Sequence, residues 1–266
     1  MLLIDLISRK KILFDLLKNI PKKLLNHKVS GISINSKDIK NDYIFVAVKG
    51  QKFDGSDFIL EAKKNGAFLV ISNKSNDAYD VISNNKISTR LIYTELLSSY
   101  YDTQPKEIIG VTGTNGKTST VDFCRQLWVQ AGWKAASMGT LGTKIETSLN
   151  KKFLRPSKDN LTTFYPEELY KELHRLKAEE ISHLALEASS HGLDQYRLDG
   201  VKFSGAVFTN LSHDHLDYHK NIESYYNCKK RLFTQILQNN LPDLNVTLVN
   251  DRECTSLDTI DFETLK

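Results

Sequence analysis

The segment from Gly110 to Ser119 constrains the fold of this chain more than any other, because it reads Gly-Val-Thr-Gly-Thr-Asn-Gly-Lys-Thr-Ser. It follows the apolar pair Ile108 and Ile109 and precedes a run from Thr120 to Gln130 that is compatible with a helix. A strand, a glycine-rich loop and a helix in this order are typical of a phosphate-binding loop, in which backbone N–H groups and the positive end of the helix face an anion. The sequence therefore predicts a nucleoside triphosphate site.

Two side chains at the end of this loop have predicted roles. Lys117 can reach terminal phosphate oxygens, and the hydroxyl group of Thr118 can ligate Mg²⁺. The general pattern has a glycine five positions before Gly116, where Val111 stands, so the match is to a shorter variant of the loop. The predicted nucleotide-binding residues are Gly113, Thr114, Asn115, Gly116, Lys117, Thr118 and Ser119.

Length and composition exclude several classes of protein. The chain has 266 residues, of which 40% are hydrophobic and 26% charged, and this is enough for one large domain or two ordinary ones. Its 36 basic and 32 acidic residues are interleaved, so we expect no nucleic-acid partner. The three cysteines have no Cys-x-x-Cys spacing, which favours neither a disulfide framework nor a zinc site. With no segment typical of a membrane span, we expect a cytoplasmic protein without membrane insertion.

Residues 1–103 form the first predicted domain. Its apolar residues between Leu2 and Leu17 suggest an amphipathic helix. The polar segment from Asp102 to Pro105 is a plausible domain junction. Strands are expected at Gly31–Ile34, Tyr43–Val48 and Ala67–Ile71, and helices at Ser56–Asn65 and in a segment that ends near Tyr101.

Residues 104–266 form the second predicted domain, in which strands, loops and helices alternate. This order predicts an α/β fold with a doubly wound, mainly parallel sheet, incomplete at its C-terminal end. Strands are expected at Glu107–Thr112, Ser182–Leu186, Gly205–Thr209 and Val246–Val249, with helices at Pro166–Glu179 and Ile222–Gln238. Ligands of such sheets bind beyond the carboxyl ends of the strands, and polar clusters follow each of the first three strands. We therefore expect these clusters to converge on one edge.

Some polar residues at these positions could carry chemistry. Glu187 ends an apolar strand, where a buried carboxylate is costly unless it is paired or binds a metal. Binding of Mg²⁺ beside the triphosphate and capping of the next helix are equal alternatives for it. The stretch from His213 to His219 also allows a zinc site, which ranks below a magnesium nucleotide because no distant ligand completes the zinc sphere.

Other polar residues are weaker indicators. Thr162, Thr163, Gln195 and Arg197 are polar loop positions that could hold a polar substrate. Lys229 is followed by two further basic residues, and such a run usually forms a solvated face.

A block of motifs from Leu186 to Phe233 is more specific than any single residue. It contains Glu187–Gln195, which reads Glu-Ala-Ser-Ser-His-Gly-Leu-Asp-Gln, then Phe208–Leu211, Asp214–His219 and Lys229-x-x-Leu232-Phe233. Together with the loop from Thr112 to Thr118, these motifs resemble the Mur ligases, and the resemblance runs from about Ser30 to Asn250. The first domain resembles the uridine-nucleotide domain of that family at Ser36-Lys37-Asp38, Ile44–Gly50 and Asp54-Gly55.

The resemblance implies an ATP-dependent, amide-forming ligase of peptidoglycan precursor synthesis. ATP would phosphorylate the D-glutamate carboxylate of UDP-MurNAc-L-Ala-D-Glu, and the amine of a diamino acid, diaminopimelate or lysine, would attack the acyl phosphate. Catalysis of this kind rests on positioning and on charge neutralisation by Mg²⁺ and a lysine. We expect such an enzyme to act as a monomer.

The resemblance also implies roles for single residues. Lys117 would contact the β- and γ-phosphates, Thr118 would bind one Mg²⁺, and Glu187 and His215 would serve a second metal position. Lys229 would be carbamylated, and its anionic form would help to hold Mg²⁺. The expected catalytic residues are therefore Lys117, His215 and Lys229. The expected substrate-binding residues are Ser36, near the uracil, and Thr162, Thr163, Ser190, Gln195 and Arg197.

The sequence also departs from the family pattern. Asn35, Lys37, Asn41 and Phe164 replace residues that are usual in the family, and no segment matches the family's third domain. A truncated, non-catalytic fragment that binds only nucleotide or UDP-sugar is therefore the alternative hypothesis. A folylpolyglutamate synthetase is a third possibility, against which the uridine-domain motifs and the Asp214–His219 block argue.

Overall fold

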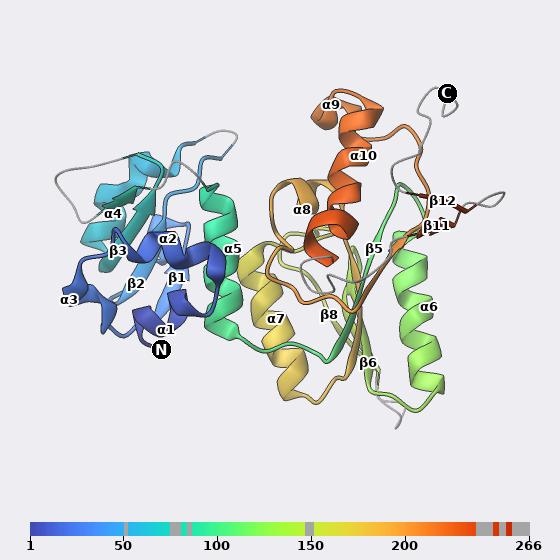
Figure 1. Ribbon diagram of the computed structural model, residues 1–266. Coiled ribbons are helices and arrows are strands. Elements are labelled where there is room, and N and C mark those ends of the chain that lie inside the picture. The colour runs from blue at the N-terminus through green and yellow to red at the C-terminus, as the bar shows by residue number, and fades with distance from the viewer. Residues whose placement is uncertain are drawn as a thin grey trace. The chain divides into compact units, whose positions relative to one another are not determined.

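A computed structural model describes residues 1–50, 53–74, 81–83, 87–146, 152–237, 247–249 and 254–256. The chain divides into two compact units, Met1–Asp102 and Thr103–Lys266 (Figure 1). None of the helices in these described ranges is long and apolar enough to cross a membrane.

The first unit contains a parallel sheet of four strands in the order β1-β2-β3-β4. The strands are β1 Gly31–Ser33, β2 Tyr43–Val46, β3 Ala67–Ser72 and β4 Val81–Ser83. The helices are α1 Leu3–Ser8, α2 Phe14–Leu17, α3 Lys22–Leu25, α4 Ile59–Lys64 and α5 Thr89–Tyr101. Helix α4 packs on β3, and α5 contacts β1 and α1. Apolar side chains from β2, β3 and α4, including Phe45, Val70 and Ala62, form a buried core.

The N-terminal segment differs from the single amphipathic helix that its sequence predicts. Helix α1 ends at Ser8, Lys10 adopts an extended conformation, and a short 3-10 helix then leads into α2. The ammonium of Lys10 lies 3.2 Å from the carboxylate of Glu95. Five of the apolar residues that suggested the helix, Leu3, Leu6, Ile7, Leu13 and Leu16, are nevertheless buried, whereas Leu2 and Phe14 are exposed. Their pattern therefore indicated most of the burial correctly and the continuity of the helix wrongly.

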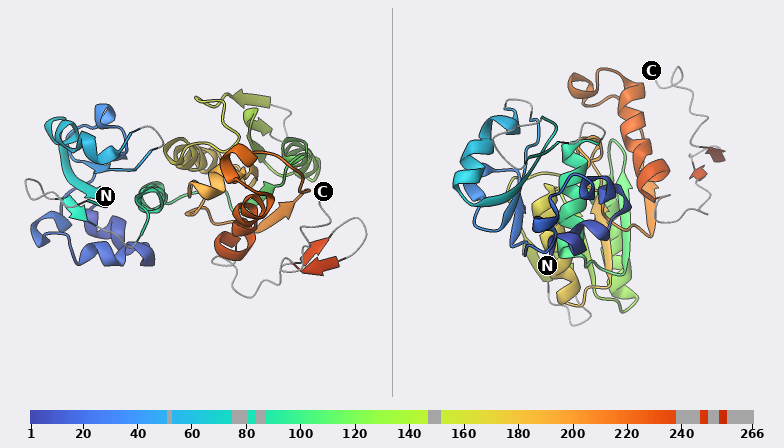
Figure 2. Two further views of the ribbon diagram at one scale, coloured as in Figure 1. Left: turned by 90° about the horizontal axis from the view of Figure 1, so that it is seen from above. Right: turned by 60° about the vertical axis from the view of Figure 1, so that its left-hand side comes forward.

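The second unit contains a six-stranded sheet in the order β10-β5-β9-β6-β7-β8. The strands are β5 Glu107–Thr112, β6 Ala135–Gly139, β7 Gly142–Glu146, β8 Lys152–Arg155, β9 His183–Glu187 and β10 Gly205–Phe208. The four strands from β10 to β6 run parallel, whereas β7 and β8 are antiparallel. Helices α6 Lys117–Gln130 and α7 Pro166–Ala178 lie on opposite faces of this sheet (Figures 1 and 2). The predicted fold class, α/β with mainly parallel sheets, is confirmed.

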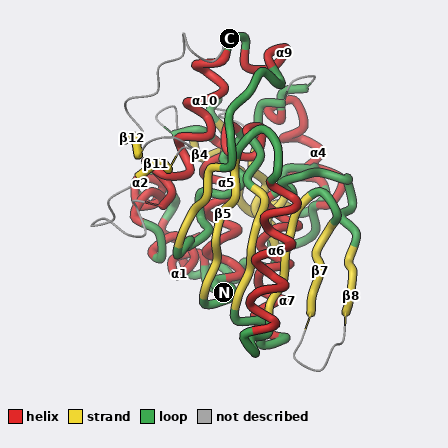
Figure 3. The backbone as a smooth tube through the Cα atoms, turned by 90° about the vertical axis from the view of Figure 1, so that its right-hand side faces the viewer, coloured by secondary structure: helices red, strands yellow, loops and turns green. Residues whose placement is uncertain are grey.

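The antiparallel strands β7 and β8 were not foreseen from the sequence. Figure 3 shows them side by side at the edge of the sheet. Strands β6 and β7 form a hairpin in which Gly139 pairs with Gly142, so only two residues, Thr140 and Leu141, make the turn. Gly142 has φ +85, a conformation that glycine adopts at no steric cost.

Two further sequence-based predictions near the C-terminal end need correction. The segment Val246–Val249 was expected to be a fourth strand of the main sheet. Instead, β11 Thr247–Val249 pairs antiparallel with β12 Cys254–Ser256 in a separate two-stranded sheet. The predicted helix Ile222–Gln238 is helix α10, which covers Ile222–Arg231 and is followed by a π-helix at Leu232–Leu237.

The topology brings three loops to one edge of the sheet, as the sequence predicted. Strands β10, β5 and β9 are neighbours, with Phe208 opposite Thr112 and Val111 opposite Glu187. Since parallel strands end on the same side, the segments that follow all three strands emerge together.

Candidate functional site

Backbone geometry shapes the phosphate-binding loop between β5 and α6. Gly113 and Gly116 have φ angles of +139 and +83, which residues with a side chain rarely adopt. A Cβ atom on Gly113 would lie 1.9 Å from the hydroxyl oxygen of Thr209. Helix α6 starts at Lys117 and runs for 14 residues, so its positive end opens onto this loop. The backbone thus forms a cradle of the kind that holds an anion.

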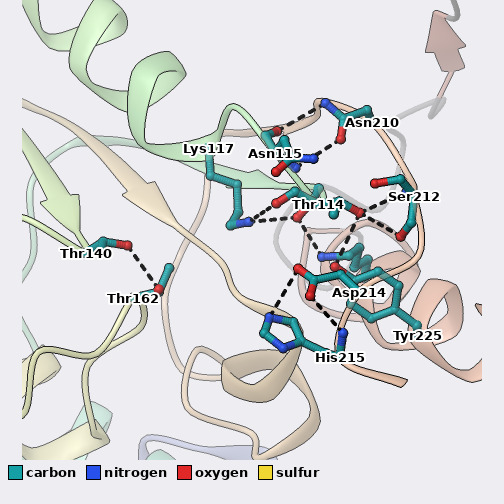
Figure 4. Close-up of polar contacts among 12 residues, drawn as sticks. Thr114, Asn115, Lys117, Thr140, Thr162, Asn210, Ser212, Asp214, His215 and Tyr225 are labelled. Atoms are coloured by element: carbon teal, nitrogen blue, oxygen red, sulfur yellow. Dashed lines mark hydrogen bonds and ion pairs between the residues drawn. The ribbon is translucent and has the colours of Figure 1, made fainter. Parts of the chain in front are cut away.

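The segment after β10 holds this loop in place (Figure 4). The backbone N–H of Thr114 donates to the carbonyl of Asn210 at 2.9 Å, and the N–H of Asn115 donates to the Asn210 side chain at 3.0 Å. The hydroxyl oxygen of Thr114 accepts from the N–H of Ser212 at 3.0 Å and from the hydroxyl of Tyr225 at 3.3 Å. Sequence reasoning assigned no role to Asn210 or Ser212, although both follow a strand that ends at this edge.

Lys117 lies over its own loop (Figure 4). Its ammonium donates to the carbonyls of Gly113 at 2.9 Å and Thr114 at 2.7 Å. Burial lowers the pKa of Lys117, and the carboxylates of Glu187 and Asp214 oppose this shift. The site therefore contains a partly desolvated cation with two acidic neighbours.

Glu187 lies at the end of β9, and its side chain is almost fully buried, with 1% exposed. One carboxylate oxygen accepts from the hydroxyl of Thr118 at 3.0 Å, and the other accepts from the backbone N–H of Thr140 at 3.0 Å. Burial raises the pKa of Glu187, while these hydrogen bonds and the charge of Lys117 counteract the rise. Helix α8, Ser190–Asp194, is capped by Ser189 instead, so the helix-capping alternative for Glu187 is wrong.

The donor set around Thr118 and Glu187 fits magnesium better than zinc. Among the described residues, no group of three or more His, Cys, Asp and Glu side chains is arranged to hold a metal ion. A hydroxyl and a carboxylate oxygen suit Mg²⁺, which keeps several water ligands and takes phosphate oxygens as further ligands.

His215 is placed differently from the other predicted metal ligands. It has φ +53 and lies at the start of α9 Leu216–His219. Its ring is 3.5 Å from the carboxylate of Asp214 (Figure 4). The centroid of the ring is 4.9 Å from that of His191. Within the described part of the chain, no hydrogen bond or ion pair joins His215 to Glu187. The structure thus brings Lys117 and Glu187 into one site and leaves His215 beside Asp214.

Lys229 is buried, with 1% exposed, so the interpretation of its basic run as a solvated face is wrong at this residue. Its ammonium donates to the carbonyl of Gly113 at 2.7 Å and lies 4.2 Å from the centre of the Tyr225 ring. Burial, followed by repulsion from Lys117, lowers the pKa of Lys229 to about 7. A substantial share of its amine is therefore neutral near neutral pH.

Three of the predicted substrate-binding residues hold one another. The hydroxyl of Thr163 donates to the carbonyl of Glu187 at 2.9 Å, and the guanidinium of Arg197 donates to the carbonyl of Thr163. Arg197 also donates to the side chain of Gln195 at 2.7 Å and stacks over the ring of Tyr165. These contacts shape the loop behind Glu187.

The other three predicted substrate-binding residues make different contacts. Thr162 is half-buried, and its hydroxyl is 3.0 Å from that of Thr140. Ser190 is buried at the start of α8. Ser36 lies in the first unit, where its hydroxyl donates to Glu61.

Two known protein families match this chain. The family described as "Mur ligase middle domain" matches residues 111–259, more than half of the sequence. The chain belongs to the Mur ligase family. A second match, to "Mur ligase family, catalytic domain", covers residues 28–96 of this Mur ligase chain.

Curated relatives of this Mur ligase chain carry the name UDP-N-acetylmuramoyl-L-alanyl-D-glutamate–2,6-diaminopimelate ligase. The relative from Brucella melitensis is 40% identical over 217 residues, which cover 81% of this chain and 43% of the relative. The relative from Rickettsia conorii is 43% identical over 228 residues, which cover 85% of this chain and 47% of the relative. The chain thus spans less than half the length of these curated relatives.

Solved structures show the same similarity. A structure titled as a UDP-N-acetylmuramoyl-L-alanyl-D-glutamate–2,6-diaminopimelate ligase matches with a TM-score of 0.69 and 31% identity, covering 80% of this chain and 42% of that one. MurF from Acinetobacter baumannii matches with a TM-score of 0.51 and 20% identity, over 82% of this Mur ligase chain and 43% of that one. At that identity, the second match supports the fold alone.

Proposed function

We propose that this Mur ligase chain functions in ATP-dependent amide formation, joining a diamino acid to UDP-MurNAc-L-Ala-D-Glu. The observation that carries the proposal is the contact of Thr118 with the buried Glu187 beside Lys117, at the open end of a phosphate-binding loop. The names of relatives that are 40–43% identical favour diaminopimelate as the diamino acid.

Bound ATP with Mg²⁺ would supply the phosphoryl group that converts the D-glutamate carboxylate into an acyl phosphate. The loop backbone and Lys117 would hold the terminal phosphates by charge-assisted hydrogen bonds. Thr118 and Glu187 would hold Mg²⁺. The loop backbone is fixed by the segment after β10 before the ligand binds, so it needs little reorganisation to hold the phosphates.

Lys229 would contribute as a carbamate. Its neutral amine, present near neutral pH because burial lowers the pKa, would attack CO₂. A nitrogen–carbon bond forms while one C–O π bond of CO₂ opens to a carboxylate, the nitrogen releases one proton to solvent, and the neutral amine becomes an anionic carbamate. This change would remove the repulsion between Lys229 and Lys117 and add a negative group beside the loop.

The remaining predicted residues would act on the UDP-sugar substrate. We assign binding of the uridine nucleotide to the first unit, with Ser36. We assign binding of ATP to the second predicted domain, residues 104–266. Thr162 and Ser190 would contact the dipeptide, while Thr163, Gln195 and Arg197 would position their loop. We further propose that His215 approaches the metal site only when ligands are bound, and that the protein acts as a cytoplasmic monomer.

Binding and turnover of ATP by the chain test this function. Lys117→Ala removes the charge-assisted hydrogen bonding of the ammonium to phosphate, where one such bond contributes about 1.5–3 kcal/mol, so ATP affinity should fall by at least about tenfold. Lys202→Ala, at an exposed lysine of the same unit, is the control and should bind ATP as the unmodified chain does. Titration calorimetry with ATP and MgCl₂ measures both variants. Equal affinity of the Lys117→Ala variant and the unmodified chain would refute the assignment.

Release of ADP separates the two candidate functions. Binding of nucleotide and UDP-sugar without turnover is the second candidate function; the chain spans 43% and 47% of the length of the two relatives. ADP should appear only when ATP, UDP-MurNAc-L-Ala-D-Glu and diaminopimelate are all present. Tight binding of both nucleotides without ADP release would support the second candidate.

A further inference from the structure

Thr140 belongs to none of the motifs and lies in the two-residue turn between β6 and β7. Its hydroxyl oxygen is 3.0 Å from that of Thr162 and 3.4 Å from a carboxylate oxygen of Glu187. Its backbone N–H donates to the other carboxylate oxygen of Glu187 at 3.0 Å. Figure 4 shows Thr140 and Thr162 facing each other from two different segments.

These contacts continue toward the phosphate-binding loop. The hydroxyl of Thr118 donates to the same carboxylate oxygen of Glu187 that Thr140 approaches. The approach of the turn depends on Gly139, because a Cβ atom there would lie 2.1 Å from Glu187. An unbroken series of polar contacts therefore runs from Thr118 through Glu187 and Thr140 to Thr162.

The hydroxyl of Thr140 has a single proton, so it can donate to only one of its two neighbours at a time. When it donates to Glu187, its oxygen can accept the proton of Thr162, and Thr162 then presents only lone pairs to a ligand. When Glu187 is occupied by another partner, Thr140 can donate to Thr162. The proton of Thr162 is then free to reach an oxygen of an anionic ligand.

We propose that Thr140 is a positioning residue that couples occupancy of the nucleotide site to binding of the acidic sugar-peptide substrate at Thr162. The inference rests on the proposed function, because it takes ATP and the UDP-MurNAc-dipeptide as the two ligands. When the nucleotide occupies the site at Thr118 and Glu187, Thr140 donates to Thr162 instead of to Glu187. The hydroxyl of Thr162 can then donate a hydrogen bond to the substrate carboxylate. By linkage, the substrate strengthens nucleotide binding by the same factor.

The test measures the affinity of the chain for UDP-MurNAc-L-Ala-D-Glu by calorimetry, with and without the β,γ-imido analogue of ATP and MgCl₂. In the unmodified chain, the nucleotide should raise substrate affinity at least about fivefold. Thr140→Val removes the hydroxyl and keeps the backbone N–H. The nucleotide should therefore no longer raise the substrate affinity of this variant, and the coupling factor should be about one. The affinity for each ligand alone should change less than about threefold. Thr140→Ser restores the hydroxyl and should restore the coupling.

A second threonine supplies the matched control. The hydroxyl of Thr143, in β7 of the same hairpin, is buried and has no hydrogen-bond partner among the described residues. Thr143→Val should therefore leave the coupling factor unchanged. If Thr140→Val does not fold, Thr162→Val removes the other end of the contact and should abolish the coupling in the same way.

The outcomes separate this inference from the proposed function. Coupling that persists in Thr140→Val, or that is missing from an unmodified chain that binds both ligands, overturns the inference and leaves the ligase proposal intact. An unmodified chain that binds neither ligand overturns both.

Discussion

Replacement of Lys229 by methionine tests whether the buried amine destabilises the fold as the structure implies. Methionine has a similar unbranched length and carries no charge. The carbonyl of Gly113, which accepts from Lys229 at 2.7 Å, keeps its hydrogen bond from Lys117 at 2.9 Å. The variant therefore removes a desolvated cation without leaving its acceptor unpaired.

The magnitude follows from the pKa of Lys229, which burial lowers from 10.5 to about 7. Since one pKa unit corresponds to about 1.4 kcal/mol, the charged ammonium destabilises the folded unit by about 5 kcal/mol. Protonation favours the unfolded chain, in which the lysine keeps its ordinary pKa. The penalty is complete below pH 7, decreases as the pH rises above 7, and vanishes above the unfolded pKa. Between pH 6 and pH 9 it decreases by about 3 kcal/mol.

Urea unfolding at pH 6 and pH 9 measures this effect. Both tryptophans, Trp128 and Trp133, lie in the second unit, so their fluorescence reports the unfolding of that unit alone. Buffers free of CO₂ keep Lys229 unmodified. The Lys229→Met variant should be more stable than the unmodified chain at pH 6, and its advantage should shrink by about 3 kcal/mol at pH 9.

Lys202→Met, at an exposed position, is the control, and its difference from the unmodified chain should be the same at both pH values. An advantage of Lys229→Met that does not change with pH would refute the reasoning, because the stability change would then not come from the charge of the amine.

Two further predictions concern the loop and a buried ion pair. Gly113→Ala should weaken ATP binding at least about tenfold in titration calorimetry, because φ +139 and the contact with Thr209 forbid a side chain. The control is Gly132→Ala, which also lies at a positive φ but has no atom within 4 Å of the added Cβ, and this variant should keep the ATP affinity of the unmodified chain. Arg125→Met removes a buried ion-pair partner of Glu146 and should destabilise the second unit by up to about 3–5 kcal/mol in urea unfolding. The double variant with Glu146→Leu should recover most of the lost free energy of unfolding. If Arg125→Met alone is as stable as the unmodified chain, the prediction is contradicted.

Some parts of the fold and site follow from local sequence. Strand β5 has the bounds that its apolar residues predicted, and the loop from Gly113 to Gly116 follows it directly. The sequence could determine these features because a glycine at positive φ and a short apolar run impose their conformation on neighbouring residues. The convergence of three loops on one edge was also predictable, because parallel strands end on the same side.

Other parts depend on contacts between distant segments. Strands β7 and β8 carry few consecutive apolar residues, and their pairing with β6 has no strong local signal. The turn residue Thr140 meets Glu187 across 47 positions. His215 is adjacent to Asp214 in the sequence, but only the tertiary structure directs its ring toward His191.

The sequence by itself determined the α/β class, the phosphate-binding loop and the presence of Glu187 at the end of a strand. Only the tertiary structure decided that Lys229 is buried, since its acceptor, the carbonyl of Gly113, lies 116 positions away. The reason is physical: backbone conformation depends on nearby residues, whereas the loss of water around a charged group depends on which distant segments pack against it.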